Sequence, residues 1–159
     1  MTPTVYFHED QHFRGSMLWS ISAILIAVAI GVGARLATRE PVGAAVAISI
    51  LVAVFVLFAL ARLETEVRDD TIYVHFHGIW PTRRIPLADI VGYEAKRYTM
   101  WESGGWGVHL GLAGMTYNVS GNEGVHFRLK SGSGVLVGTQ RPKEFATAVA
   151  TALEARRTR

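Results

Sequence analysis

The sequence has no cysteine and few charged residues. Its 159 residues include 16 Lys and Arg and 13 Asp and Glu, so that 18% of the chain is charged, whereas soluble domains average about 25%. Without cysteine the chain cannot form a disulfide scaffold or a zinc site built on thiolates. Half of its residues are hydrophobic, which excludes a disordered tail. The apolar excess must therefore be concentrated in part of the chain.

Two long stretches contain no charged side chain and no histidine. They cover residues 15–34 and 41–61. Because a helix needs about 20 apolar residues to cross a membrane, we predict two spans, over about 16–36 and 42–61. Core helices of soluble proteins usually keep a polar face, and the segment before the first stretch lacks the basic character of a signal peptide. Proton relays and ion pathways need ionisable groups at membrane depth, so we interpret the hairpin 15–61 as an anchor.

The linker between the two spans is short, which makes them antiparallel neighbours. Small residues at helical spacing in the first span are expected to form the contact between the helices; these are Ala23, Ala27 and Gly31. An even number of spans places both termini on one side. Three arginines flank the spans on the terminal side and two lie in the linker, so the positive-inside rule favours cytoplasmic termini. We therefore expect a multi-pass protein of the cell membrane with a cytoplasmic C-terminal domain.

Residues 1–14 are interpreted as a juxtamembrane flank. Residues 62–159 differ sharply from the hairpin in their charge and in their pattern of apolar residues. This C-terminal segment holds 13 basic and 10 acidic residues, so its net charge of +3 equals that of the whole chain. Short runs of alternating apolar and polar residues, separated by turn residues, predict about seven strands. The apolar side chains of Phe145, Ala148, Val149, Ala152 and Leu153 then recur at helical spacing after Pro142. They predict an amphipathic helix over 142–156.

Several short sequences resemble a family of bacterial pleckstrin-homology-like (PH-like) membrane proteins. They are Ile85-Pro-Leu-Ala-Asp-Ile90, Gly104-Gly-Trp-Gly107, Tyr117-Asn-Val-Ser-Gly-Asn-Glu-Gly-Val125, Val137-Gly-Thr-Gln-Arg-Pro142 and Phe13-Arg14 before the first span. The resemblance covers roughly residues 5–155. It implies an α+β membrane protein in which the transmembrane hairpin is followed by one strongly bent antiparallel sheet, capped by the C-terminal helix. The family has no settled activity, and the PH-like fold serves mainly to bind lipids, peptides or proteins.

No catalytic motif stands out. The sequence contains no P-loop, nucleophile elbow, Rossmann fingerprint or metalloprotease helix, so we expect neither enzymatic activity nor a cofactor. His75 and His77 share one face of a strand and could place two imidazoles on a metal ion. No third ligand can be chosen from the sequence, so no metal site is predicted. Two alternatives stay open: an enzyme or accessory subunit with an unrecognised site, and a purely structural hairpin that organises a membrane complex.

Basic and aromatic residues provide a candidate binding surface. The basic residues are expected on neighbouring strands, where each would attract anionic headgroups by about 1 kcal/mol. Tryptophan is enriched at membrane and protein interfaces alike. A solvated face, partly neutralised by Glu94 and Asp89, is the alternative. We expect a protein partner or an anionic lipid at the inner leaflet, and no nucleic acid. The candidate residues are Arg83, Arg84, Lys96, Arg97, Trp101 and Trp106.

Overall fold

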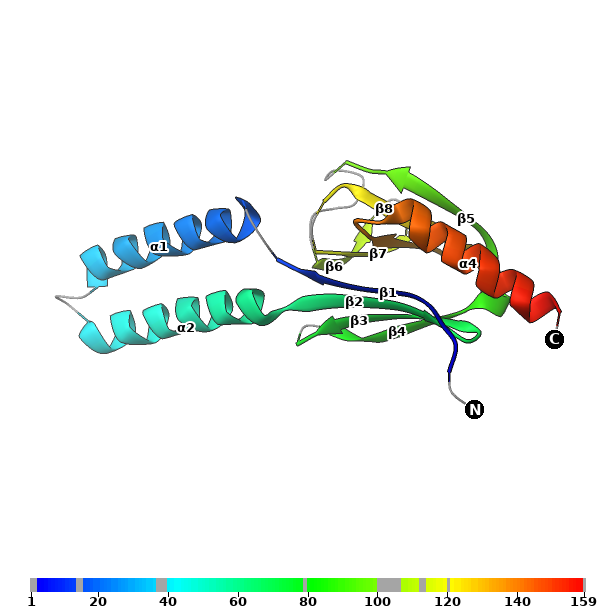
Figure 1. Ribbon diagram of the computed structural model, residues 1–159. Helices are drawn as coiled ribbons and strands as arrows, with labels where there is room; N and C mark the ends of the chain where they lie inside the picture. Colours follow the sequence, from blue (N-terminus) through cyan, green and yellow to red (C-terminus); the bar gives the residue numbers. More distant parts are fainter. Residues whose placement is uncertain are drawn as a thin grey trace. The chain divides into compact units, whose positions relative to one another are not determined.

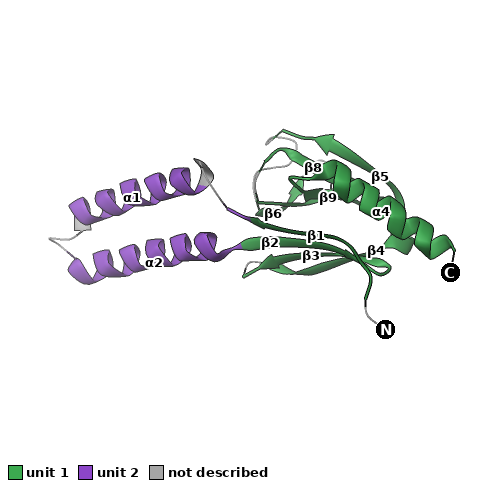
Figure 2. Cartoon of the chain, viewed as in Figure 1, with its two compact units in different colours: residues 1–11, 62–159 green, residues 12–61 purple. Residues whose placement is uncertain are grey.

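The chain folds as two units. The computed structural model describes residues 3–13, 16–36, 40–78, 80–99, 107–111, 114–119 and 121–158. One unit is the hairpin, residues 12–61, and the other combines residues 1–11 with 62–159 (Figure 2). This confirms an α+β chain with two apolar N-terminal helices and one C-terminal helix. The elements, labelled in Figure 1, are β1 (Val5–His12), α1 (Ser16–Leu36), α2 (Pro41–Leu60), β2 (Arg62–Arg68), β3 (Thr71–His77), β4 (Trp80–Pro86), the short 3₁₀ helix η1 (Leu87–Asp89), β5 (Ile90–Arg97), β6 (Gly107–Gly111), β7 (Gly114–Asn118), β8 (Glu123–Leu129), β9 (Gly134–Gly138) and α4 (Pro142–Arg157).

The two hairpin helices expose apolar side chains around most of their circumference. Both are long and apolar enough to cross a membrane, and 0% of the apolar window of α1 and 6% of that of α2 are buried. The hydroxyls of Ser22 and Ser49 donate to the carbonyls of Leu18 and Ala45, at 2.6 and 2.8 Å. These polar groups are therefore satisfied within their own helices, as a lipid environment requires.

The contact between α1 and α2 is not the one predicted. The small residues Ala23, Ala27 and Gly31 are exposed. Larger side chains, among them Leu25 and Leu51, line the groove where the two helices meet. The prediction was wrong because residues on the adjacent face of α1 follow the same helical spacing, and spacing alone does not decide which face packs.

The first sheet has four strands in the order β1-β2-β3-β4. The start of β1 lies beside the end of β2, because the Asp69 N–H donates to the Thr4 carbonyl and the Thr4 N–H donates to the Asp69 carboxylate, both at 2.9 Å. The two strands are therefore antiparallel. Strand β1 falls in the segment 1–14 that the sequence indicated to be a flank. The interpretation missed it because two of its inward-facing residues, Glu9 and Gln11, are polar, so the apolar alternation is masked.

The second sheet has five strands in the order β5-β8-β9-β7-β6. Strand β9 pairs antiparallel with β8 and parallel with β7. Three consecutive residues of β9, Val135, Leu136 and Val137, are buried, which suits a central strand covered on both faces. The prediction of one antiparallel sheet is therefore corrected to two sheets, one of which contains a parallel pair.

The chain leaves the first sheet at a corner. Pro86 ends β4 and cannot donate to a ladder, and the Leu87 N–H donates instead to the Asp70 carbonyl at 2.8 Å. Leu87 is itself buried as the first residue of η1. Strand β5 then pairs with β8 and not with β4. The single bent sheet that the sequence predicted is therefore divided at this corner, because β5 does not continue the pairing of β4.

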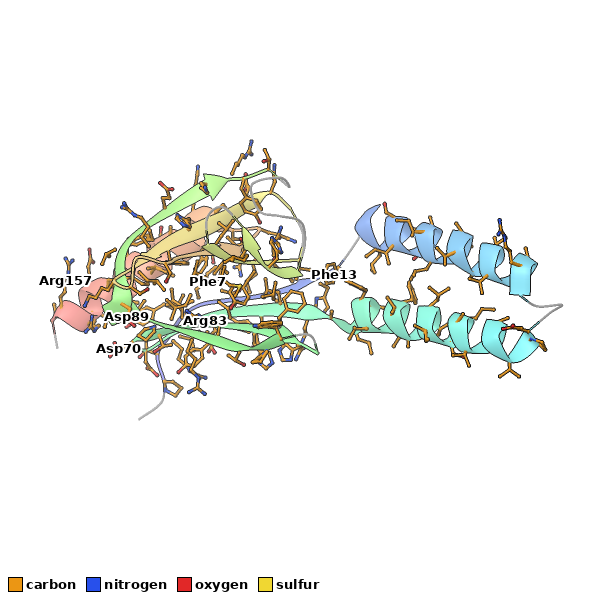
Figure 3. The ribbon with its side chains drawn as sticks, turned by 180° about the vertical axis from the view of Figure 1, so that it is seen from behind. Phe7, Phe13, Asp70, Arg83, Asp89 and Arg157 are labelled. Atoms are coloured by element: carbon orange, nitrogen blue, oxygen red, sulfur yellow. The ribbon has the colours of Figure 1, made fainter. Side chains whose placement is uncertain are left out.

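Strand β1 connects the first sheet to the second sheet and to α4. The Phe7 ring stacks on Phe145 of α4 with 4.8 Å between centroids, and Figure 3 shows Phe7 on the side of β1 that faces α4. The Gln11 amide donates to the Gly138 carbonyl at 2.8 Å. The buried carboxylate of Glu9 accepts hydrogen bonds from the Thr139 hydroxyl and from the Gln140 N–H. The N-terminal strand is thus an integral part of the β unit.

Candidate functional site

A group of titratable side chains lies on the outer face of the first sheet. Strict alternation buries Leu63, Thr65 and Val67 of β2, and Ile72, Val74 and Phe76 of β3. The intervening side chains must then point outward. The strand register places Glu64 opposite His75, and β1 adds two further residues beside them. We call this group the outer-face cluster; its members are His8, Asp10, Glu64, His75 and His77.

Glu64 is the centre of the outer-face cluster. Its carboxylate lies 2.7 Å from His77 Nε2 and 3.9 Å from His8 Nδ1. His8 Nε2 is in turn 3.5 Å from the Asp10 carboxylate. The hydrogen bond with His77 is the largest of the effects that lower the pKa of Glu64 below its usual value, and it outweighs the opposing effect of burial. Glu64 is therefore an ionised acceptor near neutral pH.

The two imidazoles of β3 are stacked. The rings of His75 and His77 lie 3.8 Å apart and within 6° of parallel. Beside them is a small polar recess of about 140 Å³. Its wall includes Tyr73, whose ring lies 4.7 Å from the guanidinium of Arg68 and 5.9 Å from that of Arg84. The face thus places imidazoles and a carboxylate next to a cationic rim.

The basic candidates lie on two separate strands. Arg83 and Arg84 are exposed on β4, where the register pairs them with Val74 and Tyr73 respectively. Lys96 and Arg97 lie on β5, which belongs to the other sheet. The structure therefore does not place the four residues on hydrogen-bonded neighbouring strands. The Arg97 side chain is also engaged, since its Nε donates to Glu123 at 2.6 Å.

The structure places neither of the two aromatic candidates. Trp101 and Trp106 lie outside the described residues. Trp80 is 48% exposed at the start of β4. Trp80 pairs with Phe76 of β3. The next residue of β3, His77, pairs with Arg62, where β2 begins after α2. Trp80 therefore lies at the end of the first sheet into which the chain passes from the hairpin.

Sequence reasoning identified His75 and His77 but missed the other cluster members. The signal for Glu64 was present, because the turn at 68–71 sets the register of the β2–β3 hairpin. No comparable signal existed for His8 and Asp10, since the partner of β1 is separated from it by the entire hairpin.

No protein-family model matches the chain, and no significant match was found among curated proteins.

Proposed function

We propose that the chain is a membrane-anchored binding module without catalytic activity of its own. In this proposal α1 and α2 span the membrane, and the β unit binds its ligand in the cytoplasm, at the inner leaflet. The supporting observation is that two helices of membrane-spanning length leave 0% and 6% of their apolar windows buried. Such an apolar surface requires lipid or protein to cover it, because soluble proteins rarely expose large apolar patches.

The edge strand β4 is the surface that we propose for binding. Six of its seven residues are exposed. They include Arg83, Arg84 and the half-exposed Trp80. An amphipathic tryptophan next to arginines is the combination that favours the headgroup region of a membrane. The register places Arg83 and Arg84 on opposite faces of β4, so that each would act separately and contribute about 1 kcal/mol, or roughly fivefold in affinity, near an anionic surface.

Anionic lipid headgroups fit this edge better than a peptide strand does. A partner strand that extends a sheet needs an uninterrupted row of backbone donors and acceptors. Pro81 and Pro86 have no N–H group, and proline on an edge strand is a device against such pairing. Guanidinium groups, in contrast, bind phosphate oxygens without any strand register. We therefore propose an anionic phospholipid as the ligand, in preference to a protein partner.

Photo-crosslinking in native membranes tests this proposal. A photoreactive amino acid replaces the exposed Thr82 on β4, and a matched control replaces the exposed Thr147 on α4. We expect lipid adducts at position 82 that are strongly reduced when Arg83→Ala and Arg84→Ala are added, and few adducts at position 147. Adducts with a protein at position 82 would contradict the proposed lipid ligand and would indicate a protein partner instead. Equal lipid labelling at both positions would remove the basis for a binding surface on β4.

The proposed orientation has its own test. A reporter enzyme that is active only outside the cytoplasm is fused after Arg159, and a second reporter that is active only inside is fused at the same position. We expect activity from the second alone, because the positive-inside rule favours cytoplasmic termini. Activity from the first would invert the orientation without affecting the hairpin itself.

A further inference from the structure

The outer-face cluster has the composition of a transition-metal site. Glu64, His75 and His77 offer ligand atoms that all lie within 4.8 Å of one another. Two imidazole nitrogens and one carboxylate oxygen suit zinc and related divalent ions, whereas calcium and magnesium prefer oxygen ligands throughout. From this juxtaposition we propose that Glu64, His75 and His77 bind one divalent transition-metal ion, with zinc as the reference ion.

The geometry requires the imidazole rings to turn, because each binds a metal in its own plane and the planes of His75 and His77 lie within 6° of parallel. In a tetrahedral zinc site the ligands lie about 2.0–2.2 Å from the ion, and hence roughly 3.4 Å from each other. Starting from separations of up to 4.8 Å, the side chains must close by little more than about 1 Å. The stacked imidazoles can do so by rotating about χ1 and χ2 on a fixed backbone. The strands need not move, because Glu64 and His75 already lie opposite each other.

The surroundings of the site favour a divalent ion. His8 and Asp10 form a second group with Glu64, whose ligand atoms also lie within 4.8 Å of one another. The carboxylates of Glu64 and Asp10 both lie in the cluster and supply negative charge that attracts a divalent cation. His8 lies next to the ligand Glu64, and Asp10 lies next to His8. Residues in such positions around a metal site can orient its ligands. The side chains of Glu64 and His77 are 31% and 28% exposed, so an ion can enter and water can complete its coordination.

This proposal does not depend on the binding of lipid by β4. The proposed ligands are not residues of β4, although Thr82 borders the recess beside His75, and the metal can be measured without any lipid ligand. The full chain is purified in detergent with an affinity tag that contains no histidine, and it is stripped with EDTA. After incubation with zinc chloride and gel filtration, the zinc retained per chain is measured by mass spectrometry. Cobalt is bound in parallel, since its visible spectrum reports tetrahedral coordination.

The variants separate ligands from their surroundings. We expect one zinc ion per wild-type chain and none in the double variant His75→Ala, His77→Ala. Glu64→Gln, which keeps nearly the same shape, should also lose the ion. The matched control is His126→Ala, because His126 lies 3.9 Å from Glu94 in the second sheet; it should bind zinc as the wild type does.

Folding is monitored separately from binding. Far-UV circular dichroism in EDTA should be the same for Glu64→Gln and the wild type, and zinc should raise the melting temperature of the wild type but not that of Glu64→Gln. A wild-type chain that retains no zinc would overturn the proposal. A double histidine variant that binds zinc as tightly as the wild type would overturn it equally.

Discussion

Replacing Glu9 with leucine tests whether β1 holds the two sheets of the β unit together. The Glu9 side chain is 6% exposed and accepts hydrogen bonds from the Thr139 hydroxyl and the Gln140 N–H, the latter at 3.0 Å. Hydrogen bonds to a charged group contribute about 1.5–3 kcal/mol each, so that their combined loss is about 3–6 kcal/mol. Relief from burying a charge offsets part of this cost. We expect the free energy of unfolding to fall by about 2–4 kcal/mol.

A loss of that size is a large fraction of the 5–15 kcal/mol that stabilises a typical domain. For a domain of about 100 residues it corresponds to a fall in melting temperature of roughly 10–20 °C. Near-UV circular dichroism of the full chain in detergent measures this shift, and hydrogen exchange should show loss of protection in β1. Glu94→Leu is the control, because the Glu94 side chain is 68% exposed. If Glu9→Leu and Glu94→Leu melted at the same temperature, β1 would not be the connection between the sheets.

Three further predictions concern single positions in the β unit. Phe145→Ala should lower the free energy of unfolding by about 3–5 kcal/mol, because a fully buried aromatic ring is lost; urea denaturation checks this, and a cost below about 1 kcal/mol would contradict it. Tyr98→Phe should be neutral or stabilising by up to about 1 kcal/mol, because the buried hydroxyl has no hydrogen-bond partner among the described residues. Burial also raises the pKa of Tyr98. The unfolded chain therefore ionises first as the pH rises past 10.0, stability falls there, and a pH series of melting curves should show a weaker fall for Tyr98→Phe; an unchanged alkaline fall would refute this. Gly114→Ala should be far more destabilising in thermal melts than Gly121→Ala. Both glycines have positive φ, but only at Gly114 would a Cβ collide with the backbone of Gly134, and equal melting temperatures would show that the collision is relieved.

The parts of the fold that could be predicted from the sequence are those that local patterns determine. The apolar runs predicted both hairpin helices, and the spacing of Phe145, Ala148 and Val149 predicted α4 within one residue of its observed end. Pairing between distant segments was not predictable in this way. Strand β1 carries Glu9 and Gln11 on its buried face, where a sequence pattern would require apolar residues. Its partners are β2 and the segment after β9, and no local signal specifies either of them.

The candidate site shows the same division. Two of its histidines were visible as alternate residues on one strand. The third ligand, Glu64, depends on the register of a hairpin, which turn geometry determines and which can be worked out with care. His8 and Asp10 depend on the long-range pairing of β1. The grouping of Arg83 and Arg84 with Lys96 and Arg97 assumed that consecutive strands are neighbours, and Pro86 together with η1 breaks that assumption.

The antiparallel pairing of β1 with β2 gives the helical hairpin an unusual place in the chain. The two strands are adjacent in the sheet, yet residues 13–61 connect them, so the hairpin occupies the position of a β-turn. During synthesis β1 is made first but has no partner until both helices and β2 have followed, and it therefore pairs late. The same geometry suggests how to separate the two units: a two-residue Asn-Gly turn could replace the 49 residues between the strands. The product would be a β unit without the two hairpin helices, with every strand of the first sheet retained.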